Sequence, residues 1–211
     1  DQSFSTTHYH VISTSATQKG QYGCQLWMSA TIDVGGQGAV QMKHLKVLSS
    51  SPRHLLVAVR HPVLKLDVLV GHSPHTKDTK AIDPWWDSLQ SAVQGRDTSF
   101  PLLLLMDCNG KVGDVSSEHI GSHQADEQCK IGARLHEFLV KQALILPATF
   151  QEMQVGPGAT FADSASGLHR IDYVGIPAAW KGPAITAWIE KEVDLATVKD
   201  DQLAAAVSFT L

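Results

Sequence analysis

The most apolar segment of the chain is Leu102–Met106, a run of five apolar residues that ends close to a turn at Gly110. A run of this length bounded by turn residues predicts a strand buried on both faces. An acid and an amide follow directly. Because strand side chains alternate, a chain that stays extended places Asp107 and Asn109 on one face and Cys108 on the other. The alternative is an Asx turn closed by Gly110, and the segment alone leaves both interpretations open.

Alternation of β-branched or aromatic residues with polar ones predicts the other strands. Segments 9–14 and 22–30 are expected to form a β-hairpin with its turn near Lys19-Gly20. Further strands are predicted at 44–49, 54–60, 63–71, 160–161, 169–176, 184–193 and 203–211. The glycine-rich segment 33–38 follows no buried strand and opens no helix, so a loop is favoured over a dinucleotide site.

Two segments have helical spacing. The first is predicted to begin at Asp83, the cap, with Pro84 in the first helical position, and to end at Gly95. Its tryptophans and leucine recur on one face, which favours core packing over a ligand platform. The second and longest helix is predicted over 126–144. Hairpins of strands that flank two helices indicate an α+β sandwich, with two sheets face to face and the helices outside.

Composition is that of a folded globular protein. The chain has 211 residues, enough for one domain over 1–211, with 43% hydrophobic and 18% charged residues. A net charge of −4 argues against a strongly basic nucleic-acid coat. No segment has the roughly 18 apolar residues of a membrane span, and the start is not that of a signal peptide. The three cysteines are scattered, which favours a reducing, intracellular setting, nuclear or cytoplasmic.

Polar residues gather at three more strand ends. His72 and His75 follow an apolar strand, Asp172 lies inside another, and the triplet Asp200-Asp201-Gln202 precedes the last. A histidine after a strand is usually a surface or capping residue, and the two aspartates of the triplet also suit a solvated turn. A carboxylate within an apolar strand is costly to bury unless it is paired. Asp172 is therefore the most informative of these residues.

These residue types suit phosphodiester hydrolysis. That reaction needs a divalent cation on hard oxygen ligands, a group that orients or deprotonates water, and donors that balance growing charge on phosphorus. Carboxylates, an amide and histidines supply those parts. The candidates are His72, His75, Asp107, Asn109, Asp172 and Asp201. A zinc enzyme is disfavoured because no HExxH helix or cysteine ligand pair accompanies the histidines.

The order of the segments GHSPH, MDCNGKVG and HRIDYVG, followed by an Asp-containing turn before the final strand, resembles the endonuclease/exonuclease/phosphatase superfamily. This superfamily is also called DNase I-like, and the likeness is strongest to endonuclease domains of non-LTR retrotransposons. It covers the chain from about residue 9 onward. The resemblance implies a four-layered α/β/β/α sandwich with a Mg²⁺ or Mn²⁺ site at one end of two sheets.

The resemblance also implies a role for each candidate. His72 would orient the phosphate or donate a proton, with His75 beside it, and Asn109 would contact the scissile phosphate. Asp107 would position water and bind metal together with Asp201. Asp172 would orient a histidine, and the neighbouring Arg170 would contact substrate.

The chain departs from the family pattern in two places. The family has Ser-Asp-His before its last strand, whereas Gln202 stands here in the histidine position. Glutamine forms hydrogen bonds but does not carry a proton near neutral pH. The family's metal-binding glutamate would lie upstream of Asp1. We therefore expect an N-terminally incomplete domain without its first strand and helix, and impaired activity.

The predicted function is that of a metal-dependent phosphodiester hydrolase, a DNA endonuclease of the retrotransposon type. One alternative is a catalytically inactive member of the fold that serves as a binding or structural module. Another is a phosphatase or lipid phosphodiesterase of the same superfamily. The expected partner is nucleic acid, specifically DNA, with no membrane, for a monomeric domain or a part of a larger polyprotein.

Overall fold

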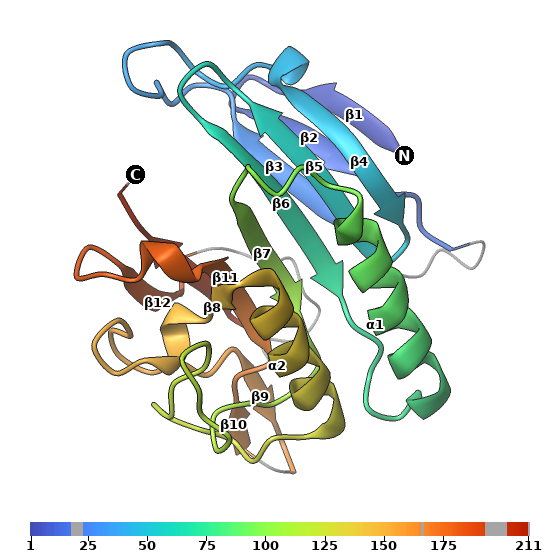
Figure 1. Cartoon of the computed structure of the whole chain (residues 1–211), viewed down its shortest axis with the longest axis vertical. Coiled ribbons are helices and arrows are strands. Elements are labelled where there is room, and N and C mark those ends of the chain that lie inside the picture. The colour runs from blue at the N-terminus through green and yellow to red at the C-terminus, as the bar shows by residue number, and fades with distance from the viewer. Residues whose placement is uncertain (18–22, 166, 193–201, 211) are drawn as a thin grey trace. The chain divides into compact units, whose positions relative to one another are not determined.

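Short strands and two α-helices make up the described part of the chain, which comprises residues 1–17, 23–165, 167–192 and 202–210 of a computed structural model (Figure 1). The chain divides into two units, one of residues 1–72 with 87–104 and the other of residues 73–86 with 105–211. We call them unit 1 and unit 2. Strand β7 (Leu102–Asp107) and helix α1 (Thr79–Gln94) each contribute residues to both.

The first sheet of unit 1 has the antiparallel order β1-β2-β3. Its strands are β1 (Gln2–Ser5), β2 (Tyr9–Ser13) and β3 (Gln25–Ser29). Pairing of Tyr9 with Ser29 confirms the predicted hairpin, while its turn at Lys19-Gly20 lies outside the described residues. Strand β1 was not predicted because three of its four residues are polar and all four are exposed, so hydrogen bonding to β2 forms it without an alternating apolar pattern.

The second sheet of unit 1 has the order β4-β5-β6, followed by the first half of β7. Its strands are β4 (Leu45–Ser51), β5 (His54–Arg60) and β6 (Lys65–His72). Residues 54–59 of β5 are all buried, so both faces of this strand are covered. The strand predicted from residue 63 begins two residues later, because a tight turn joins the backbones of His61 and Leu64.

A buried carboxylate in unit 1 forms ion pairs with two arginines. Asp67 has no solvent exposure, and it lies 2.8 Å from the guanidinium of Arg60 and 3.6 Å from that of Arg96. Its backbone N–H donates to the carbonyl of Pro101. Two cations offset the cost of burying this charge, so Asp67 has a structural explanation.

The sheet of unit 2 has the order β7-β11-β8, with β11 at Asp172–Pro177 and β8 at Leu144–Ile145. Two separate two-stranded sheets complete unit 2. These are β9 (Phe161–Asp163) with β10 (Gly167–His169), and β12 (Thr186–Glu190) with β13 (Ala204–Ser208). Short 3₁₀ turns lie at Met42–His44 in unit 1, and at Pro147–Thr149 and Ala178–Trp180 in unit 2.

The strand predicted over 169–176 is broken in two. His169 ends β10 and Asp172 begins β11. Side chains take the intervening backbone donors, since Arg170 N–H donates to the carboxylate of Asp126 and Ile171 N–H donates to the hydroxyl of Thr160. These bonds replace part of a regular strand ladder, which an apolar pattern along the sequence does not reveal.

Helix α1 begins earlier than predicted. It starts at Thr79, so Pro84 lies inside it and Asp83 is not its cap. The carboxylate of Asp83 instead lies 2.7 Å from the ammonium of Lys130 and 3.6 Å from Arg134 on α2. The apolar stripe is core as predicted, with Trp85, Trp86, Leu89 and Val93 all buried. Within unit 2, the ring of Trp86 lies 5.9 Å from that of Phe138.

Helix α2 (Lys130–Gln142) is shorter than the predicted segment 126–144. It begins after Cys129, whose sulfur accepts a hydrogen bond from Gly132 N–H, and it ends at Ala143 in the left-handed conformation with φ 51°. A capping thiol and a non-glycine left-handed residue are weak sequence signals. The four residues before Lys130 are therefore free to line a pocket.

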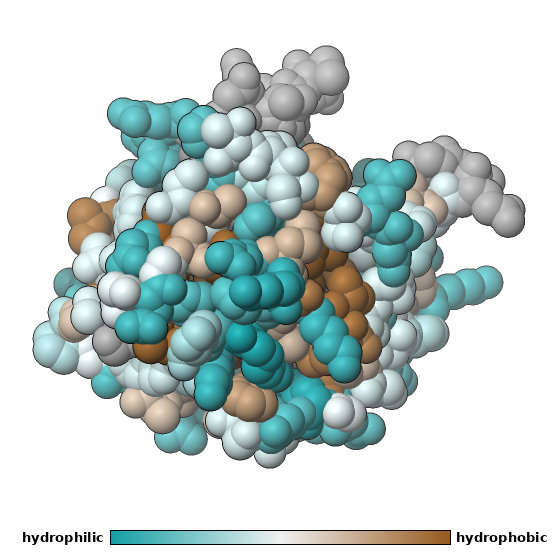
Figure 2. Space-filling model, turned by 90° about the horizontal axis from the view of Figure 1, so that it is seen from above, coloured by the Kyte–Doolittle hydropathy of each residue, from teal (hydrophilic) through white to brown (hydrophobic). Residues whose placement is uncertain are grey.

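The surface mixes hydrophilic and apolar residues. Figure 2 shows one face, with hydrophilic side chains across its centre and apolar ones beside them. Several large apolar side chains are exposed, among them Trp27 at 56% and Leu168 at 70%. No helix in the described ranges combines the length and the apolar character needed to cross a membrane.

Candidate active site

The end of β7 forms a tight polar turn. Asp107 is the last strand residue, and its Oδ1 accepts the backbone N–H of Asn109 at 3.1 Å. Asn109 has φ 50°, so the chain does not stay extended and the predicted alternation stops at Cys108, which is fully buried. The Asx-turn alternative is thus confirmed locally. It also sets the direction of the Asn109 side chain.

The loop after β6 is bound to this turn within unit 2. Ser73 N–H donates to the carbonyl of Asp107 at 2.9 Å, and Asn109 Nδ2 donates to the carbonyl of Ser73 at 3.0 Å. His75 lies two residues further along this loop and is exposed, and its Nδ1 accepts the backbone N–H of Lys77 at 3.2 Å. The amide of Asn109 is therefore held by a backbone carbonyl and keeps one N–H for another partner.

Asp172 begins the neighbouring strand β11. Cys108 N–H donates to the carbonyl of Ile171 at 2.8 Å, which brings the end of β7 to the start of β11. The hydroxyl oxygen of Thr160 accepts the N–H groups of Ile171 and Asp172, at 3.0 and 3.1 Å. Asp172 Oδ2 is buried and has no hydrogen-bond partner among the described residues.

Burial makes Asp172 an unusual carboxyl group. Desolvation raises its pKa, the nearby charge of Asp107 raises it further, and a hydrogen bond with Thr160 lowers it, which leaves a pKa of about 7. Desolvation and a like charge both disfavour the ionised form, so this carboxyl holds its proton far above the usual range. Perturbed carboxyl groups of this kind gather at functional sites.

A pocket of about 970 Å³ opens in unit 2 beside these strand ends. Three predicted site residues line it, namely His75, Asn109 and Gln202. Gln202 forms a β-bridge with Phe161 and therefore lies against β9. The structure thus brings together residues from the loop after β6, the turn after β7 and the segment before β13.

Two further predicted site residues are His72 and Asp201. His72 is the last residue of β6 and belongs to unit 1, where its backbone N–H donates to Arg53 and its carbonyl accepts from the Arg53 guanidinium. Asp201, the predicted metal ligand, lies outside the described residues together with Asp200. The roles assigned to these residues stay predictions.

Arg170 is buried and bonded to backbone. Its Nε donates to the carbonyl of Gly158 at 3.0 Å and its Nη1 to the carbonyl of His123 at 3.3 Å. A Cβ on Gly158 would lie 2.1 Å from Nη2, so any other residue at this position would require the guanidinium to shift. Desolvation lowers the pKa of the guanidinium. Arg170 joins two loops here, and its contact with substrate stays a prediction.

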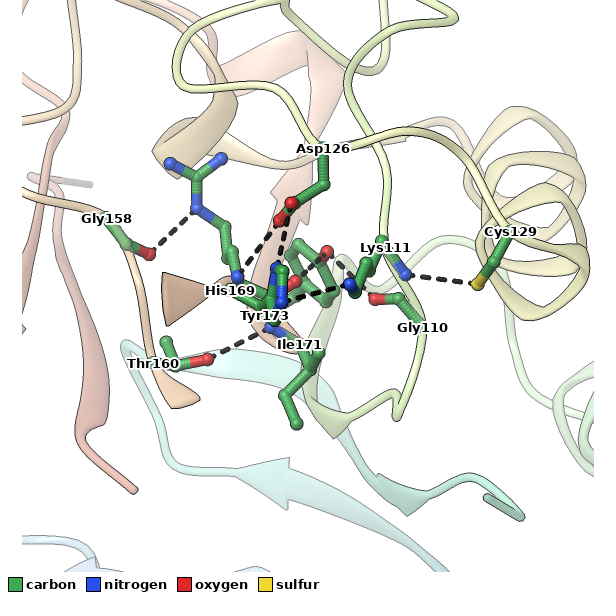
Figure 3. Close-up of polar contacts among 10 residues, drawn as sticks. Gly110, Lys111, Asp126, Cys129, Gly158, Thr160, His169, Ile171 and Tyr173 are labelled. Carbon is green, nitrogen blue, oxygen red and sulfur yellow. Dashed lines mark hydrogen bonds and ion pairs between the residues drawn. The ribbon is translucent and has the colours of Figure 1, made fainter. Parts of the chain in front are cut away.

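A second group of polar residues lines the pocket without having been predicted. Figure 3 shows His169 between Asp126 and Lys111, with the imidazole Nδ1 3.0 Å from Asp126 Oδ1 and Nε2 3.1 Å from Lys111 Nζ. Lys111 lies two residues after Asn109, and His169 lies three before Asp172. Proximity to those motifs was the available signal, but nothing local links positions 111, 126 and 169.

The donor set suits a hard divalent cation. Mg²⁺ binds through one or two carboxylates and keeps several waters. Asp107 and Asp172 supply carboxylate oxygens, and the unpartnered Oδ2 of Asp172 is an acceptor without a donor. A cation near both would also offset their mutual repulsion. Among the described residues no cluster of three or more His, Cys, Asp or Glu has metal-binding geometry.

The fold is that of the endonuclease/exonuclease/phosphatase, or DNase I-like, proteins, which confirms the predicted class of α+β sandwich. The endonuclease domain of TRAS1, a telomere-specific non-LTR retrotransposon, matches with 12% identity and a TM-score of 0.62, over 96% of this chain and 80% of that domain. The 3′-5′ exonuclease NExo from Neisseria meningitidis matches with 16% identity and a TM-score of 0.64, over 97% and 80% of the two chains.

An AP endonuclease from Archaeoglobus fulgidus has 14% identity and a TM-score of 0.62, again over 97% of this chain and 80% of that one. A further structure shows NExo, described as a 3′ phosphatase, bound to a product DNA hairpin. No protein-family profile and no curated protein sequence matches the chain. At these identities the likeness establishes the fold, and the prediction of one domain over 1–211 stays a prediction.

Proposed function

We propose that this chain is a divalent-metal-dependent phosphodiester hydrolase that acts on DNA, of the endonuclease type found in non-LTR retrotransposons. The observation that carries the proposal is the meeting of Asp107, Asn109 and Asp172 at adjacent strand ends, beside a pocket, in a fold shared with nucleases and phosphatases. The TRAS1 domain supports the retrotransposon type, and the NExo complex supports a DNA substrate.

Each residue has a task that its environment suits. A bound Mg²⁺ or Mn²⁺ would polarise the phosphate oxygens and balance the charge that develops on them. Asp107 and Asp172 would hold that cation, with Asp201 as the further acid. Asn109 would direct its remaining amide N–H to the scissile phosphate, since its other bond to Ser73 fixes the side chain. His75, which lines the pocket, would orient the phosphate and supply a proton to the leaving oxygen.

A plasmid-nicking assay with Mg²⁺ or Mn²⁺ tests the proposal. Wild-type protein should nick DNA, and Asp107→Ala should lower the rate by at least about a hundredfold because it removes a group that acts in the transition state. Asp87→Ala is the matched control, since Asp87 is an exposed carboxylate on α1. Nicking that survives Asp107→Ala would remove Asp107 from the mechanism.

The same assay extends to the phosphatase alternative. An oligonucleotide with a 3′-terminal phosphate offers a monoester in the same DNA setting, and the NExo neighbour is described as a 3′ phosphatase. Release of inorganic phosphate from this substrate without nicking of plasmid would favour the phosphatase over the endonuclease. An inositol phospholipid supplies the corresponding test for a lipid phosphodiesterase.

A second candidate function rests on Gln202. This side chain lines the pocket in the position where the family pattern has histidine, and the buried Oδ2 of Asp172 has no partner. A fold that keeps its pocket and loses its proton carrier would serve as a nucleic-acid-binding module. Gln202→His separates the two candidates, because a rise in nicking rate indicates an impaired enzyme, whereas DNA binding with background nicking in both proteins indicates the module.

A further inference from the structure

Three side chains form a continuous line in the wall of the pocket in unit 2. Asp126, His169 and Lys111 are joined by contacts of 3.0 and 3.1 Å through the two nitrogens of one imidazole (Figure 3). They come from the segment before α2, from the end of β10 and from the turn after β7. The line therefore ends in an ammonium group two residues from Asn109.

Hydrogen-bond chemistry assigns the protons along this line. An ammonium group only donates, so Nε2 of His169 must be the acceptor of the bond from Lys111. Nδ1 then carries the imidazole proton and donates it to Asp126. The arrangement holds a neutral imidazole between a carboxylate and an ammonium. Because both of its nitrogens are hydrogen-bonded, the imidazole of His169 supports the ammonium of Lys111.

Both ends of the line are fixed to backbone. Lys111 N–H donates to the sulfur of Cys129, and its carbonyl accepts the N–H of Cys129, each at 3.3 Å. Asp126 uses its second oxygen to accept Arg170 N–H at 3.3 Å. The side chains of His169 and Asp126 are 11% and 22% exposed. The ammonium is thus preorganised by groups that are themselves held.

The remaining two N–H groups of Lys111 make no hydrogen bond or ion pair within the described ranges, and they lie at the pocket. Each oxygen of Asp126 already accepts a hydrogen bond, one from the imidazole and the other from Arg170 N–H. A preorganised ammonium beside a phosphate site is suited to an anionic oxygen, since a charge-assisted hydrogen bond to phosphate is stronger than a neutral one.

We propose that Lys111 binds a phosphate of the DNA backbone next to the scissile one, and that His169 and Asp126 are positioning residues that act through Lys111. The assignment rests on the proposed function for the identity of the substrate. It adds a second phosphate contact in the wall of the pocket.

Binding of a short fluorescent DNA duplex in EDTA tests the proposal without cleavage. Lys111→Gln should weaken binding about tenfold, the loss expected for one charge-assisted hydrogen bond. It should also lower the slope of log affinity against log salt by about one, because one fewer phosphate is neutralised. Lys141→Gln is the matched control, since Lys141 is an exposed lysine in the last turn of α2. Its slope and affinity should stay those of wild type.

A double-mutant cycle tests the positioning role. His169→Leu should weaken binding, and His169→Gln should recover part of the loss because Gln keeps one donor and one acceptor. In the Lys111→Gln background, His169→Leu should have no further effect, since a residue that acts through Lys111 has nothing left to orient. Additive losses would show that His169 acts independently and would overturn this part of the proposal.

The outcomes also separate this inference from the proposed function. If wild type binds DNA and the variants Lys111→Gln and Lys141→Gln have the same salt slope and affinity, the Lys111 contact is overturned. The nuclease proposal is then left standing. Loss of binding in Lys111→Gln with no nicking by wild type supports the contact and argues against the enzyme. Failure of wild type to bind DNA at all overturns both. Thermal melting of each variant identifies a folding defect. If a His169 variant does not fold, the comparison of Lys111→Gln with Lys141→Gln alone decides the proposal.

Discussion

Asp172 shows how strongly a single buried carboxyl group depends on its surroundings. It is the first residue of β11, its Oδ2 has no hydrogen-bond partner among the described residues, and its pKa is about 7. Desolvation is the larger cause and the charge of Asp107 the second. A cation bound between the two carboxylates would favour the ionised form of Asp172, so metal and proton should compete there.

The raised pKa predicts a stability that falls with pH. Below pH 3.8 the carboxyl is protonated in both states, and between 3.8 and about 7 the unfolded chain has lost a proton that the folded chain keeps. The contribution of Asp172 to folding stability therefore decreases as pH rises through this window, by up to about 4 kcal/mol. Above the window this contribution is constant.

Asp172→Asn should remove this pH dependence. The free energy of unfolding of the variant, relative to that of wild type, should rise by about 2 to 3 kcal/mol from pH 5 to pH 8, because the amide has no charge to desolvate. Urea unfolding in EDTA at the two pH values measures the gain, and Asp87→Asn, at an exposed site, should show none. An equal difference at both pH values would mean that Asp172 has an ordinary pKa.

At the scale of elements, α2 is positioned by a close approach of backbones. A Cβ on Gly132 would lie 1.9 Å from the carbonyl oxygen of Lys111, and Cys129 forms two hydrogen bonds with the backbone of Lys111. Gly110 is similarly close to Ile131, with a Cβ distance of 2.8 Å. The first turn of α2 and the turn after β7 are thus one packed structure, which supports Lys111 in the pocket.

Gly132→Ala should destabilise the protein by about 2 kcal/mol or more, although alanine is normally the better residue within a helix by up to about 1 kcal/mol. The reason is the overlap with the carbonyl of Lys111, which forces the helix and the turn apart. Gly95→Ala, where a Cβ meets nothing within 4 Å, is the control and should be near neutral. Chemical unfolding measures both. A stabilising effect of Gly132→Ala would show that the helix lies further from the turn.

At the scale of the whole molecule, the described strands and helices have the fold of nucleases and phosphatases. The carboxylate oxygens of Asp107 and Asp172 suit a divalent cation. A ligand that binds only the folded state stabilises it by mass action. Metal binding can therefore be measured on the intact chain independently of catalysis.

Mg²⁺ or Mn²⁺ at about a hundred times its Kd should raise the Tm of the wild-type protein by about 5 to 10 °C. Asp107→Ala should abolish most of that shift, because it removes a carboxylate ligand. NaCl at equal ionic strength is the control for screening. Equal shifts in wild type and Asp107→Ala would place the cation elsewhere on the protein.

Local pattern determined a large part of this protein. The apolar run at Leu102–Met106, the buried strand His54–Arg60 and the tryptophan stripe of α1 follow from burial and periodicity, which neighbouring residues encode. The resemblance of the segment order to a known superfamily also predicted the fold. The Asp-x-Asn spacing offered the turn as one of two interpretations, because an Asp carboxylate reaches a backbone N–H two residues on. These features need no partner distant in sequence.

Only the tertiary structure decided what depends on distant partners. Asp83 was predicted as a cap and instead binds Lys130, and the strand predicted through Arg170 breaks because Asp126 takes a backbone donor. The pKa of Asp172 and the line from Asp126 through His169 to Lys111 likewise arise from residues far apart along the chain. Burial and pairing of charged groups are set by folding as a whole, and no local pattern of residue types encodes them.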